Sequence, residues 1–320
     1  MYYLGMDGGG TKTAFTVIDK KGNICLEKLT GTTDYMQCGF DGFETLLKDI
    51  IATVCKELNI TLKELEYAFF GVPCYGEVKA DSRRLYEIIN NIFVEGNFSV
   101  GNDVESGWAG GLACEAGINV VCGTGAIAFG KDENNNSSRS SGWGYLCGDE
   151  GSAYWIALKG IEIFTKESDG RLDKTFLYKH YKKELDIDDD FKIIDIIHNQ
   201  FKEERNKIAS LSRLVYESAR EGDKYATKIF EQAAYEIFLM IETIYSNLDF
   251  GTHVKVSYNG GVFNSKELLI DPLRKICEKS NFQISLQSKI MKASTGSALY
   301  AYKLSGHTIN KNIINKLRGK

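Results

Sequence analysis

The sequence is poor in the residues that divide, cross-link or anchor a chain. It has only two prolines and no low-complexity linker among its 320 residues. Its four histidines lie far apart and its eight cysteines form no Cys-X-X-Cys pair, so no zinc-like cluster is visible. No apolar run approaches the roughly 20 residues of a membrane span, and no basic segment leads into a hydrophobic stretch that would direct secretion. We therefore expect a cytoplasmic protein with mostly buried, reduced thiols and no membrane partner.

Charge of neither sign dominates the chain. Lys and Arg number 39 and Asp and Glu 43, which gives a formal net charge of −4. This balance argues against nucleic acid as the main partner, because nucleic-acid-binding domains are commonly basic. Hydrophobic residues make up 43% and charged residues 26% of the chain, as in ordinary globular proteins, and the length leaves room for two domains.

Glycine is concentrated at the beginning of the chain, where an apolar run delivers Asp7 to three consecutive glycines. A second apolar run, residues 14–18, follows, so the segment is predicted to form a strand, a tight turn and a strand. Such a turn leaves backbone amides free for anions, and hydroxyl and ammonium groups can donate to phosphate oxygens. We therefore predict a phosphate-binding hairpin whose ligand contacts come from Gly9, Gly10, Thr11, Lys12 and Thr13.

An ordinary glycine-rich turn is the alternative to this phosphate site. The segment lacks the spacing and the Gly-Lys-Ser/Thr end of a P-loop. It also differs from a dinucleotide fingerprint, because its glycines lead into a strand and not into a helix. Asp7, at the end of the first strand, is predicted to hold Mg²⁺ through water, with direct coordination as the alternative.

The first third of the chain has the pattern of an α/β unit built around a mixed sheet. Apolar periodicity predicts a helix from about Phe40 to Leu58. Asp81 is predicted to cap a later helix. Further strands are expected at residues 24–29, 65–72 and 98–101.

The pattern then restarts with a strand at residues 118–122, a turn at residues 123–125 and a strand at residues 126–130, followed by a polar turn. This near-echo of the opening is the closest the chain comes to an internal repeat. Two similar halves facing each other would put two phosphate turns on opposite walls of one cleft; chance resemblance of two glycine turns is the alternative. A third glycine turn lies at residues 259–262, and a mostly helical insert is expected at about residues 173–248.

Three side chains outside the glycine turns are candidates for chemical roles. Asp103 follows a strand, at the sheet edge where open α/β folds bind ligands, so it can accept the proton of an attacking hydroxyl or merely cap the next helix. Asp149 lies among small residues at a predicted helix start, where it can hold sugar hydroxyls or act as a cap. Trp143 can present its ring to a sugar, although burial is the commoner fate of tryptophan. Three glycine turns with carboxylates suit phosphoryl transfer from ATP.

These motifs resemble those of the sugar-kinase, Hsp70 and actin superfamily, and within it the N-acetylglucosamine kinase and BadF/BadG/BcrA/BcrD ATPase family. The resemblance spans nearly the whole chain, and its most specific part is Gly142-Trp143-Gly144 followed by residues 148–155 (GDEGSAYW). It implies an α/β fold of two ribonuclease-H-like, actin-like ATPase domains with a central cleft for ATP and sugar. The other matching segments are residues 7–13, 102–103, 123–125 and 259–262.

The resemblance also implies roles for single residues. Asp103 is expected to act as general base toward the 6-hydroxyl of the sugar. ATP contacts are expected from the two phosphate turns, the adenosine motif and the helix end near the adenine, at Thr13, Gly123, Thr124, Gly125, Ala219, Gly260 and Gly261. Sugar contacts are expected from Asp34, Asp103, Ala126, Ile127, Gly142, Trp143, Gly144 and Asp149.

Two of these positions depart from the family pattern. Asp34 stands where the family often has asparagine, and Ala126 stands where it commonly has serine. A free amine would pair with Asp34, which favours glucosamine, whereas the less polar turn at Ala126 and Ile127 would fit a bulkier sugar such as N-acetylmuramate. The sugar therefore stays open among N-acetylglucosamine, N-acetylmuramate and glucosamine.

We expect an N-terminal domain over residues 1–115, a C-terminal domain over residues 116–305, and a last helix, about residues 306–320, that packs back on the first domain. The predicted function is an ATP-dependent amino-sugar kinase that uses Mg²⁺ and, by the resemblance, forms a homodimer. One alternative is an activator-type ATPase of a redox enzyme, for which Cys122 and Cys147 near glycine turns are the only support. Another is a non-enzymatic sugar sensor, although the chain starts too close to its first turn for a preceding DNA-binding domain.

Overall fold

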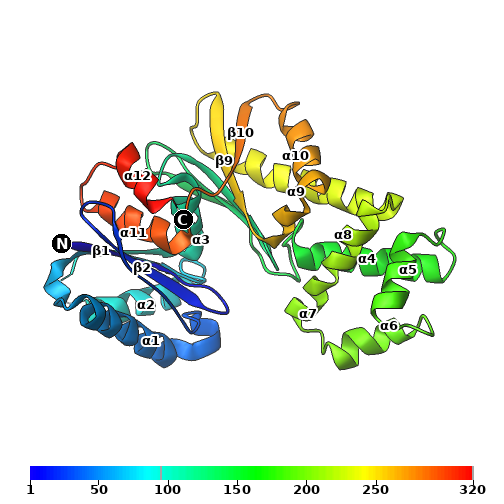
Figure 1. The fold of residues 1–320 in the computed structure, drawn as a ribbon, viewed down its shortest axis with the longest axis horizontal. Coiled ribbons are helices and arrows are strands. Elements are labelled where there is room, and N and C mark those ends of the chain that lie inside the picture. The colour runs from blue at the N-terminus through cyan, green and yellow to red at the C-terminus, as the bar shows by residue number, and fades with distance from the viewer. Residues whose placement is uncertain (94–95, 319–320) are drawn as a thin grey trace. The chain divides into compact units, whose positions relative to one another are not determined.

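The computed structural model describes residues 1–93 and 96–318, and these form two compact units. The first unit comprises Met1–Ala116 and Ser288–Lys320, and the second comprises Gly117–Gln287. Each unit contains one five-stranded sheet with helices packed against it (Figure 1). The predicted α/β architecture of two actin-like domains is therefore confirmed, while the central cleft stays a prediction.

The sheet of the first unit has the strand order β3-β2-β1-β4-β5. Antiparallel pairing joins β1 to β2 and β2 to β3, whereas β1, β4 and β5 run parallel to one another. The carboxyl ends of these three parallel strands meet at one edge, which is where Asp7 and Asp103 lie. The strands are β1 (Tyr2–Asp7), β2 (Thr13–Asp19), β3 (Ile24–Thr30), β4 (Leu65–Val72) and β5 (Phe98–Asn102).

The helices of the first unit bury apolar stripes at helical spacing, as in Phe43, Leu47, Ile50 and Val54 of α1. This helix begins five residues before the predicted Phe40, because its first turn continues past a kink at Gly39. The helices are α1 (Tyr35–Leu58), α2 (Lys79–Ile92), α3 (Asp103–Leu112), α11 (Ala293–Leu304) and α12 (Lys311–Leu317).

Asp81 does not cap α2, contrary to the sequence prediction. The helix begins at Lys79, two residues earlier, and its N-cap position is Val78, which makes no side-chain cap hydrogen bond. Asp81 instead accepts a hydrogen bond of 3.0 Å from the hydroxyl of Tyr35 on α1. Its carboxylate therefore ties two helices together.

The chain returns to the first unit at Ser288, not at about residue 306 as expected. The amides of Ile290 and Met291 donate to carbonyls at the end of α3, and α11 then packs against α3 and β1. A β-carbon on Gly296 would overlap the backbone of Gly110, so the two helices touch backbone to backbone. The expected boundary was late because α11 is buried along most of its length, so its pattern carries no signal of which sheet it covers.

The sheet of the second unit has the order β10-β9-β6-β7-β8. Antiparallel pairs join β6 to β7 and β7 to β8, and β6 pairs in parallel with β9. The order β8-β7-β6-β9-β10 thus repeats β3-β2-β1-β4-β5, so the internal repeat suggested by the two turns is a repeat of topology. The strands are β6 (Gly117–Cys122), β7 (Ala126–Lys131), β8 (Ser137–Ser141), β9 (His253–Asn259) and β10 (Gln283–Ser288).

Strand β8 was not predicted, and residues 131–138 were expected to form only a polar turn. Its sequence, Ser-Ser-Arg-Ser-Ser, has no apolar alternation and therefore no strand signature. Pairing with β7, in register from Ile127 opposite Ser141 to Lys131 opposite Ser137, makes it a strand. Tertiary context overrides local propensity here.

The second unit contains most of the helices of the chain, including the predicted helical insert. Ser152 caps α4 by accepting from the Trp155 amide, and Asp223 caps α9 by accepting from the amides of Tyr225 and Ala226. The helices are α4 (Ala153–Ser168), α5 (Phe176–Glu184), α6 (Lys192–Asp195), α7 (Arg205–Ser210), α8 (Ser212–Arg220), α9 (Lys224–Asn247) and α10 (Ile270–Cys277).

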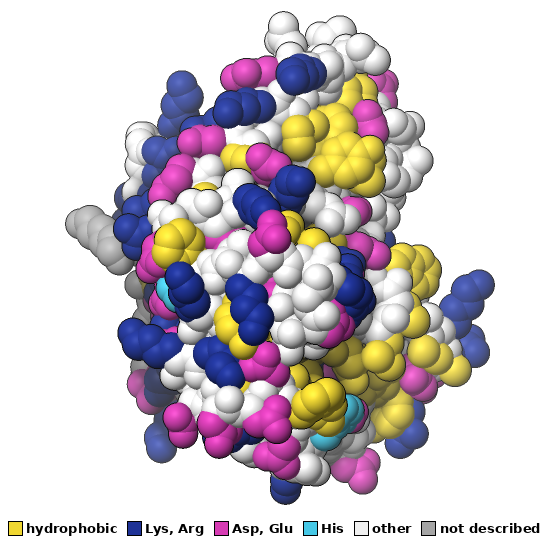
Figure 2. All heavy atoms as spheres, turned by 90° about the vertical axis from the view of Figure 1, so that its right-hand side faces the viewer, with side chains coloured by type: hydrophobic (Ala, Val, Ile, Leu, Met, Phe, Trp, Pro, Cys, Tyr) yellow, Lys and Arg dark blue, Asp and Glu magenta, His cyan; other side chains and the backbone are white. Residues whose placement is uncertain are grey.

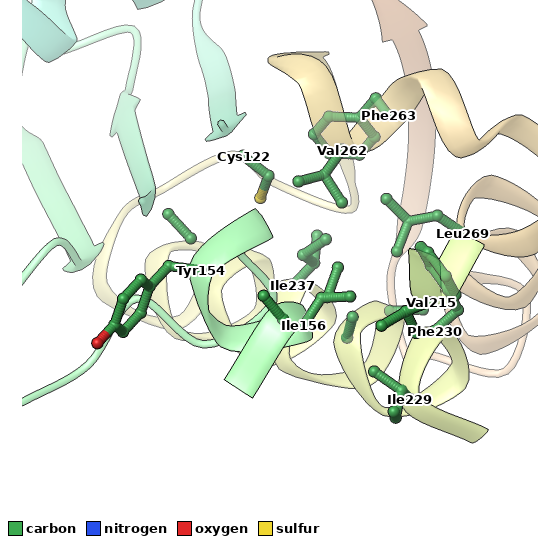
Figure 3. Packing of buried hydrophobic residues seen from close by; sticks show 14 of the residues in the cluster. Cys122, Tyr154, Ile156, Val215, Ile229, Phe230, Ile237, Val262, Phe263 and Leu269 are labelled. Atoms are coloured by element: carbon green, nitrogen blue, oxygen red, sulfur yellow. The ribbon is translucent and has the colours of Figure 1, made fainter. Parts of the chain in front are cut away.

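A buried cluster lies beneath the two glycine turns of the second unit. Figure 3 shows Cys122, at the end of β6, close to Val262 and Phe263, which follow the turn after β9. Figure 3 also shows Ile156 of α4 beside Ile237 of α9, so the helices that flank the turns share one core with them.

Charged side chains of both signs are spread over the face of the molecule that Figure 2 presents. Figure 2 shows Lys and Arg side chains interspersed with Asp and Glu over this face, with hydrophobic side chains gathered mainly toward the right of the view. Of the helices described, none combines the length and the hydropathy that crossing a bilayer requires.

The close approach of α11 and α3 at Gly296 predicts that one added methyl group there destabilises the protein. Gly296→Ala should lower the free energy of unfolding by about 2 kcal/mol or more, because the methyl group would meet backbone that cannot yield. Gly31→Ala is the matched control, since its β-carbon would meet only the Leu46 side chain at 3.7 Å, an ordinary contact. Equal denaturation midpoints for the two variants would contradict the close approach of α11 and α3.

Candidate active site

The opening hairpin exposes the residues predicted to bind phosphate at its tip. Gly10, Thr11 and Lys12 are exposed, and Gly9 is partly exposed. The base of the turn is fixed by backbone and side-chain hydrogen bonds: the Gly8 amide donates to Gly71 at 2.9 Å, and the Thr32 hydroxyl donates to the Gly9 carbonyl at 2.7 Å. The tip can therefore present amides, a hydroxyl and an ammonium group to an anion.

Thr13 differs from the other residues of this predicted phosphate site. Its side chain is fully buried, and its hydroxyl oxygen lies 2.9 Å from the hydroxyl of Thr33 and accepts from the Thr33 amide at 3.0 Å. The hydroxyl of Thr13 thus holds the hairpin against the next loop and does not point outward as expected. The reason is its position as the first residue of β2, where the side chain faces the core.

Asp103 is not the N-cap of α3, although its carboxylate also receives backbone hydrogen bonds at the start of the helix. Asn102 is the N-cap of α3, accepting from the Val104 amide at 3.2 Å and donating to the Tyr75 carbonyl at 2.9 Å. Asp103 is the first residue of the helix and is only partly exposed. Its carboxylate is therefore positioned at the carboxyl edge of β5 by a neighbour that does the capping.

The first unit concentrates negative charge around Asp103. Burial raises the pKa of Asp103 to about 6, and the nearby carboxylates of Glu77 and Asp34 add to the shift. Burial likewise raises the pKa of Asp7 to about 7, with a further contribution from Asp103 and an opposing one from Lys289. Carboxylates whose pKa values approach neutrality at the end of parallel strands are typical of sites that transfer protons or bind cations.

Asp7 fits the predicted role in Mg²⁺ binding through water. Repulsion between Asp7 and Asp103 is the kind of strain that a divalent cation relieves. The residues described include no group of three or more side chains able to ligate a metal ion. A single carboxylate suits Mg²⁺ that keeps several waters and takes further oxygens from a nucleotide.

Asp34, expected to contact the sugar, is the N-cap of α1. One carboxylate oxygen accepts from the Met36 amide at 3.1 Å, and the other accepts from the Gln37 side chain at 2.6 Å. The residue is half-buried and acts electrostatically on Asp103. Its part in sugar binding stays a prediction, and its capping role went unpredicted because Gly39 and Gly42 obscured the start of the helix.

In the second unit, the turn Gly123-Thr124-Gly125 is held by the start of α4. The Ala153 amide donates to the Gly123 carbonyl at 2.9 Å and the Tyr154 amide donates to the Thr124 carbonyl at 3.4 Å. A hydrogen bond of 2.9 Å from the Gly123 amide to the Gly125 carbonyl closes the turn. The positive end of the α4 dipole consequently lies at the turn, which favours a bound anion.

Gly260 brings the third glycine turn against the second one. Its φ of 109° lies in the region that favours glycine, and a β-carbon there would overlap the Cys122 carbonyl. The register that pairs Val121 with Asn259 across β6 and β9 sets this approach. Gly261, the next residue, faces open space.

A cavity of about 520 Å³ opens beside these two turns, within the size range of small-molecule sites. Gly123, Thr124 and Gly261, all predicted ATP contacts, line it. Ala219, also predicted to line the adenine pocket, is buried in the core one helical turn beyond Tyr216 and is not among the lining residues. The helices of the insert supply another part of the wall, through Asn206, Ser210, Ser212, Arg213 and Tyr216.

The predicted sugar loop presents an exposed tryptophan. Trp143 is 71% exposed, so the commoner fate of burial does not apply, and the Arg139 guanidinium lies 5.3 Å from its ring. Gly142 and Gly144 have φ of 75° and 83°, which explains a glycine on each side. The loop leaves Trp143 available to stack against a ligand.

Ala126 and Ile127 act on the sugar loop from β7. The Ala126 side chain is buried, but its carbonyl accepts from the Gly142 amide at 3.0 Å and its amide donates to Asp149. Ile127 is partly exposed and packs against Gly142. The expected sugar contact of Ala126 can therefore involve only its backbone, since its methyl group faces the core.

Asp149 is buried and paired with Arg205. It is 3% exposed, has a φ of 61°, and lies four residues before the helix that it was thought to begin, so it caps nothing. Its carboxylate accepts from Nη2 of Arg205, the first residue of α7. Burial raises the pKa of Asp149, and the Arg205 guanidinium opposes that shift.

Sequence reasoning missed Arg205, Tyr216 and Asn206. They belong to the helical insert, and Arg205 is 56 residues from Asp149 in sequence. Arg205 and Asn206 follow the charged run Lys202-Glu203-Glu204, which looks like a solvated face. Pairing across such a distance leaves no local pattern, so no signal in one sequence would have identified them.

A family model matches residues 4–301, described as the BadF/BadG/BcrA/BcrD ATPase family. The chain belongs to this family. Two curated relatives cover nearly the whole chain. It is 29% identical over 302 residues to the N-acetylmuramic acid/N-acetylglucosamine kinase of Clostridium acetobutylicum, covering 94% of this chain and 98% of that protein. It is 27% identical over 312 residues to the N-acetyl-D-glucosamine kinase of Dictyostelium discoideum, covering 93% and 97%.

Solved structures show the same fold as this member of the BadF/BadG/BcrA/BcrD family. A Chromobacterium violaceum protein described as an N-acetylglucosamine kinase superposes with a TM-score of 0.68 at 19% identity, over 93% of this chain and 98% of that one. A ROK family glucokinase of Streptomyces griseus with glucose and AMPPNP superposes with a TM-score of 0.55 at 15% identity, over 95% and 99%. The predicted family and fold are confirmed, and the curated relatives support the predicted enzyme class, an ATP-dependent sugar kinase.

The alternative of an activator-type redox ATPase, whose cysteines would hold an iron–sulfur cluster between subunits, is weakened at one of its two cysteines. Cys122 is fully buried, and burial raises the pKa of its thiol, whereas Cys147 is exposed. A thiol inside the core beneath a glycine turn is not placed to ligate an exposed cluster.

The contact of Gly260 with Cys122 predicts unequal effects at adjacent glycines. Gly260→Ala should destabilise the protein by about 2 kcal/mol or more, because the methyl group overlaps a carbonyl and the backbone has positive φ. Gly261→Ala, in open space, should leave the denaturation midpoint nearly unchanged. Chemical denaturation of both variants makes the test, and a Gly260→Ala midpoint equal to wild type would refute the close approach.

Proposed function

We propose that this chain transfers the terminal phosphoryl group of ATP to the 6-hydroxyl of an amino sugar. The observation that carries the proposal is the placement of Asp103 at the carboxyl edge of the sheet that also bears the glycine hairpin. Asp103 is half-buried, and its neighbour Asn102 is the N-cap of α3. The similarity to two curated amino-sugar kinases over more than nine-tenths of the chain supports it.

Asp103 is the proposed general base. Phosphoryl transfer needs an acceptor hydroxyl that gives up its proton as the oxygen attacks, and a carboxylate takes that proton. The raised pKa of Asp103, about 6, leaves most of the group deprotonated at neutral pH while making it a stronger base than an ordinary aspartate. The proton moves from the sugar hydroxyl to this carboxylate.

The remaining residues bind and orient the two substrates. The cavity beside Gly123, Thr124 and Gly261 is proposed to hold the nucleoside part of ATP, and the exposed hairpin tip at Thr11 and Lys12 is proposed to neutralise phosphate charge. Gly9, Gly10 and Gly125 contribute backbone to the same turns. Mg²⁺, held through water near Asp7, would supply further neutralisation of the phosphates.

The sugar is proposed to lie against Trp143 and to be held by Asp149, with Gly142, Gly144 and Ile127 shaping the loop. A ring with one apolar face stacks on an exposed aromatic side chain, while a buried carboxylate accepts its hydroxyl protons. N-acetylglucosamine, N-acetylmuramate and glucosamine all offer such a ring. The homodimer and the cytoplasmic location stay predictions.

Removal of the Asp103 carboxylate should abolish most of the turnover. Asp103→Asn should lower kcat by about 10²–10⁴-fold, the usual contribution of a general base, while binding of ATP stays intact. Glu105→Gln is the matched control, because this carboxylate belongs to the same helical turn and packs against Gly101. The assay is ADP release with a panel of amino sugars, and full activity of Asp103→Asn would rule out the base assignment.

The raised pKa of Asp103 predicts the acid limb of the pH profile. The base acts as a carboxylate, so kcat/KM should rise as pH rises through about 6 and level off at higher pH. At about pH 5 the rate should be near one-tenth of its plateau, because one unit below the pKa about a tenth of the group is ionised. Since Asp7 and Asp103 interact, the limb reports their joint titration. A profile that is flat between about pH 5 and 8 would contradict the proposal.

A further inference from the structure

Arg205 places a guanidinium among the residues proposed to hold the sugar. Its Nη2 donates to the buried carboxylate of Asp149 and lies against Gly125, and its guanidinium carbon is 5.5 Å from the ring centre of Tyr145, which belongs to the Trp143 loop. The Arg205 side chain is 37% exposed, whereas that of Asp149 is 4% exposed. The guanidinium of Arg205 is therefore hydrogen-bonded to Asp149 and still partly accessible to solvent.

Arg205 has hydrogen-bond donors that Asp149 does not use. A guanidinium has five N–H donors, and the recorded bond to Asp149 involves Nη2 alone. Nε is buried and finds no acceptor among the described residues, which is costly for a charged donor. A planar fork of this kind matches a carboxylate, which can accept two N–H bonds at once.

Arg205 faces the acceptor loop and not the nucleotide cavity. The next residue, Asn206, lines the 520 Å³ cavity, whereas Arg205 is not one of its lining residues. Arg205 instead contacts Asp149, the ring of Tyr145 and Gly125, a turn residue that is likewise not among those lining the cavity. An anion that binds this guanidinium would thus belong to the sugar more readily than to ATP.

We propose that Arg205 determines specificity for an acidic amino sugar, one that carries a carboxylate on an ether side chain as N-acetylmuramate does. The proposal rests on the proposed kinase function and names the substrate class of the same site. Unpaired, the Asp149 carboxylate would repel such a substrate. Arg205 neutralises Asp149 and offers its unused donors to the carboxylate of the sugar.

The first experiment compares three acceptors on the wild-type protein. These are N-acetylmuramate, its neutral methyl ester and N-acetylglucosamine, each assayed for kcat/KM by ADP release. We expect kcat/KM for N-acetylmuramate to exceed that for its methyl ester by tenfold or more, because the ester keeps the bulk of the side chain and loses its charge. Equal values for acid and ester, or no turnover of the acid beside turnover of N-acetylglucosamine, would overturn the proposal. No turnover of any of the three would instead overturn the kinase function.

The second experiment removes the guanidinium. Arg205→Gln should lower the ratio of kcat/KM for N-acetylmuramate over N-acetylglucosamine by tenfold or more, and Arg205→Lys should restore part of it as a point charge without the planar fork. Lys207→Gln on the same helix, which removes a cation paired with Glu204, is the matched control and should leave the ratio unchanged.

Two outcomes of the second experiment would overturn the proposal. An equal loss for both sugars would mean that Arg205 only positions Asp149. A rise in KM for ATP with an unchanged sugar ratio would mean that the anion is a nucleotide phosphate. If Arg205→Gln fails to fold, Arg205→Lys and the methyl-ester comparison still decide the question.

Discussion

Backbone contact between the ends of neighbouring parallel strands is the constraint on which both units depend. In the second unit, Gly260 presses against the Cys122 carbonyl, which fixes the turn after β9 beside the turn after β6. In the first unit, the Gly8 amide donates to Gly71 at the end of β4, which fixes the opening hairpin in the same manner. Only the absence of a side chain permits the approach at Gly260. Within each unit, the glycine turn is consequently held in place by the sheet that bears it.

The candidate carboxylates of the two units exist in two electrostatic settings. Asp7 and Asp103 lie half-buried near other acids, and their raised pKa values record the cost of that arrangement. Asp149 is more deeply buried but is paired with Arg205. A bound cation, or a proton taken from the substrate, would relieve the repulsion between Asp7 and Asp103. This setting therefore suits proton transfer or cation binding. The charges of Asp149 and Arg205 already balance each other, which suits the proposed role in recognising the sugar.

Much of the fold was predictable because it rests on local patterns. The strand at residues 65–72, the glycine turns and the stripe of α1 follow from apolar periodicity and turn residues, and Asp103 was identified from its place after a strand. The features that were missed depend on distant partners. Strand β8 exists only through pairing with β7, α11 belongs to the first unit through contacts with α3, and Arg205 meets Asp149 across 56 residues. Thr13 and Ala126 were predicted as ligand contacts; each is the first residue of a strand, so the direction of its side chain is set by the sheet.

The most direct test of the account is to identify the product formed from ATP and each amino sugar. Mass spectrometry detects the added phosphate, and phosphorus–proton correlation in NMR locates it on the sugar. We expect a hexosamine 6-phosphate together with ADP, formed by the wild type and about a hundredfold or more slowly by Asp103→Asn. Phosphate on another hydroxyl, or sugar binding with no phosphorylated product from any hexosamine, would contradict it.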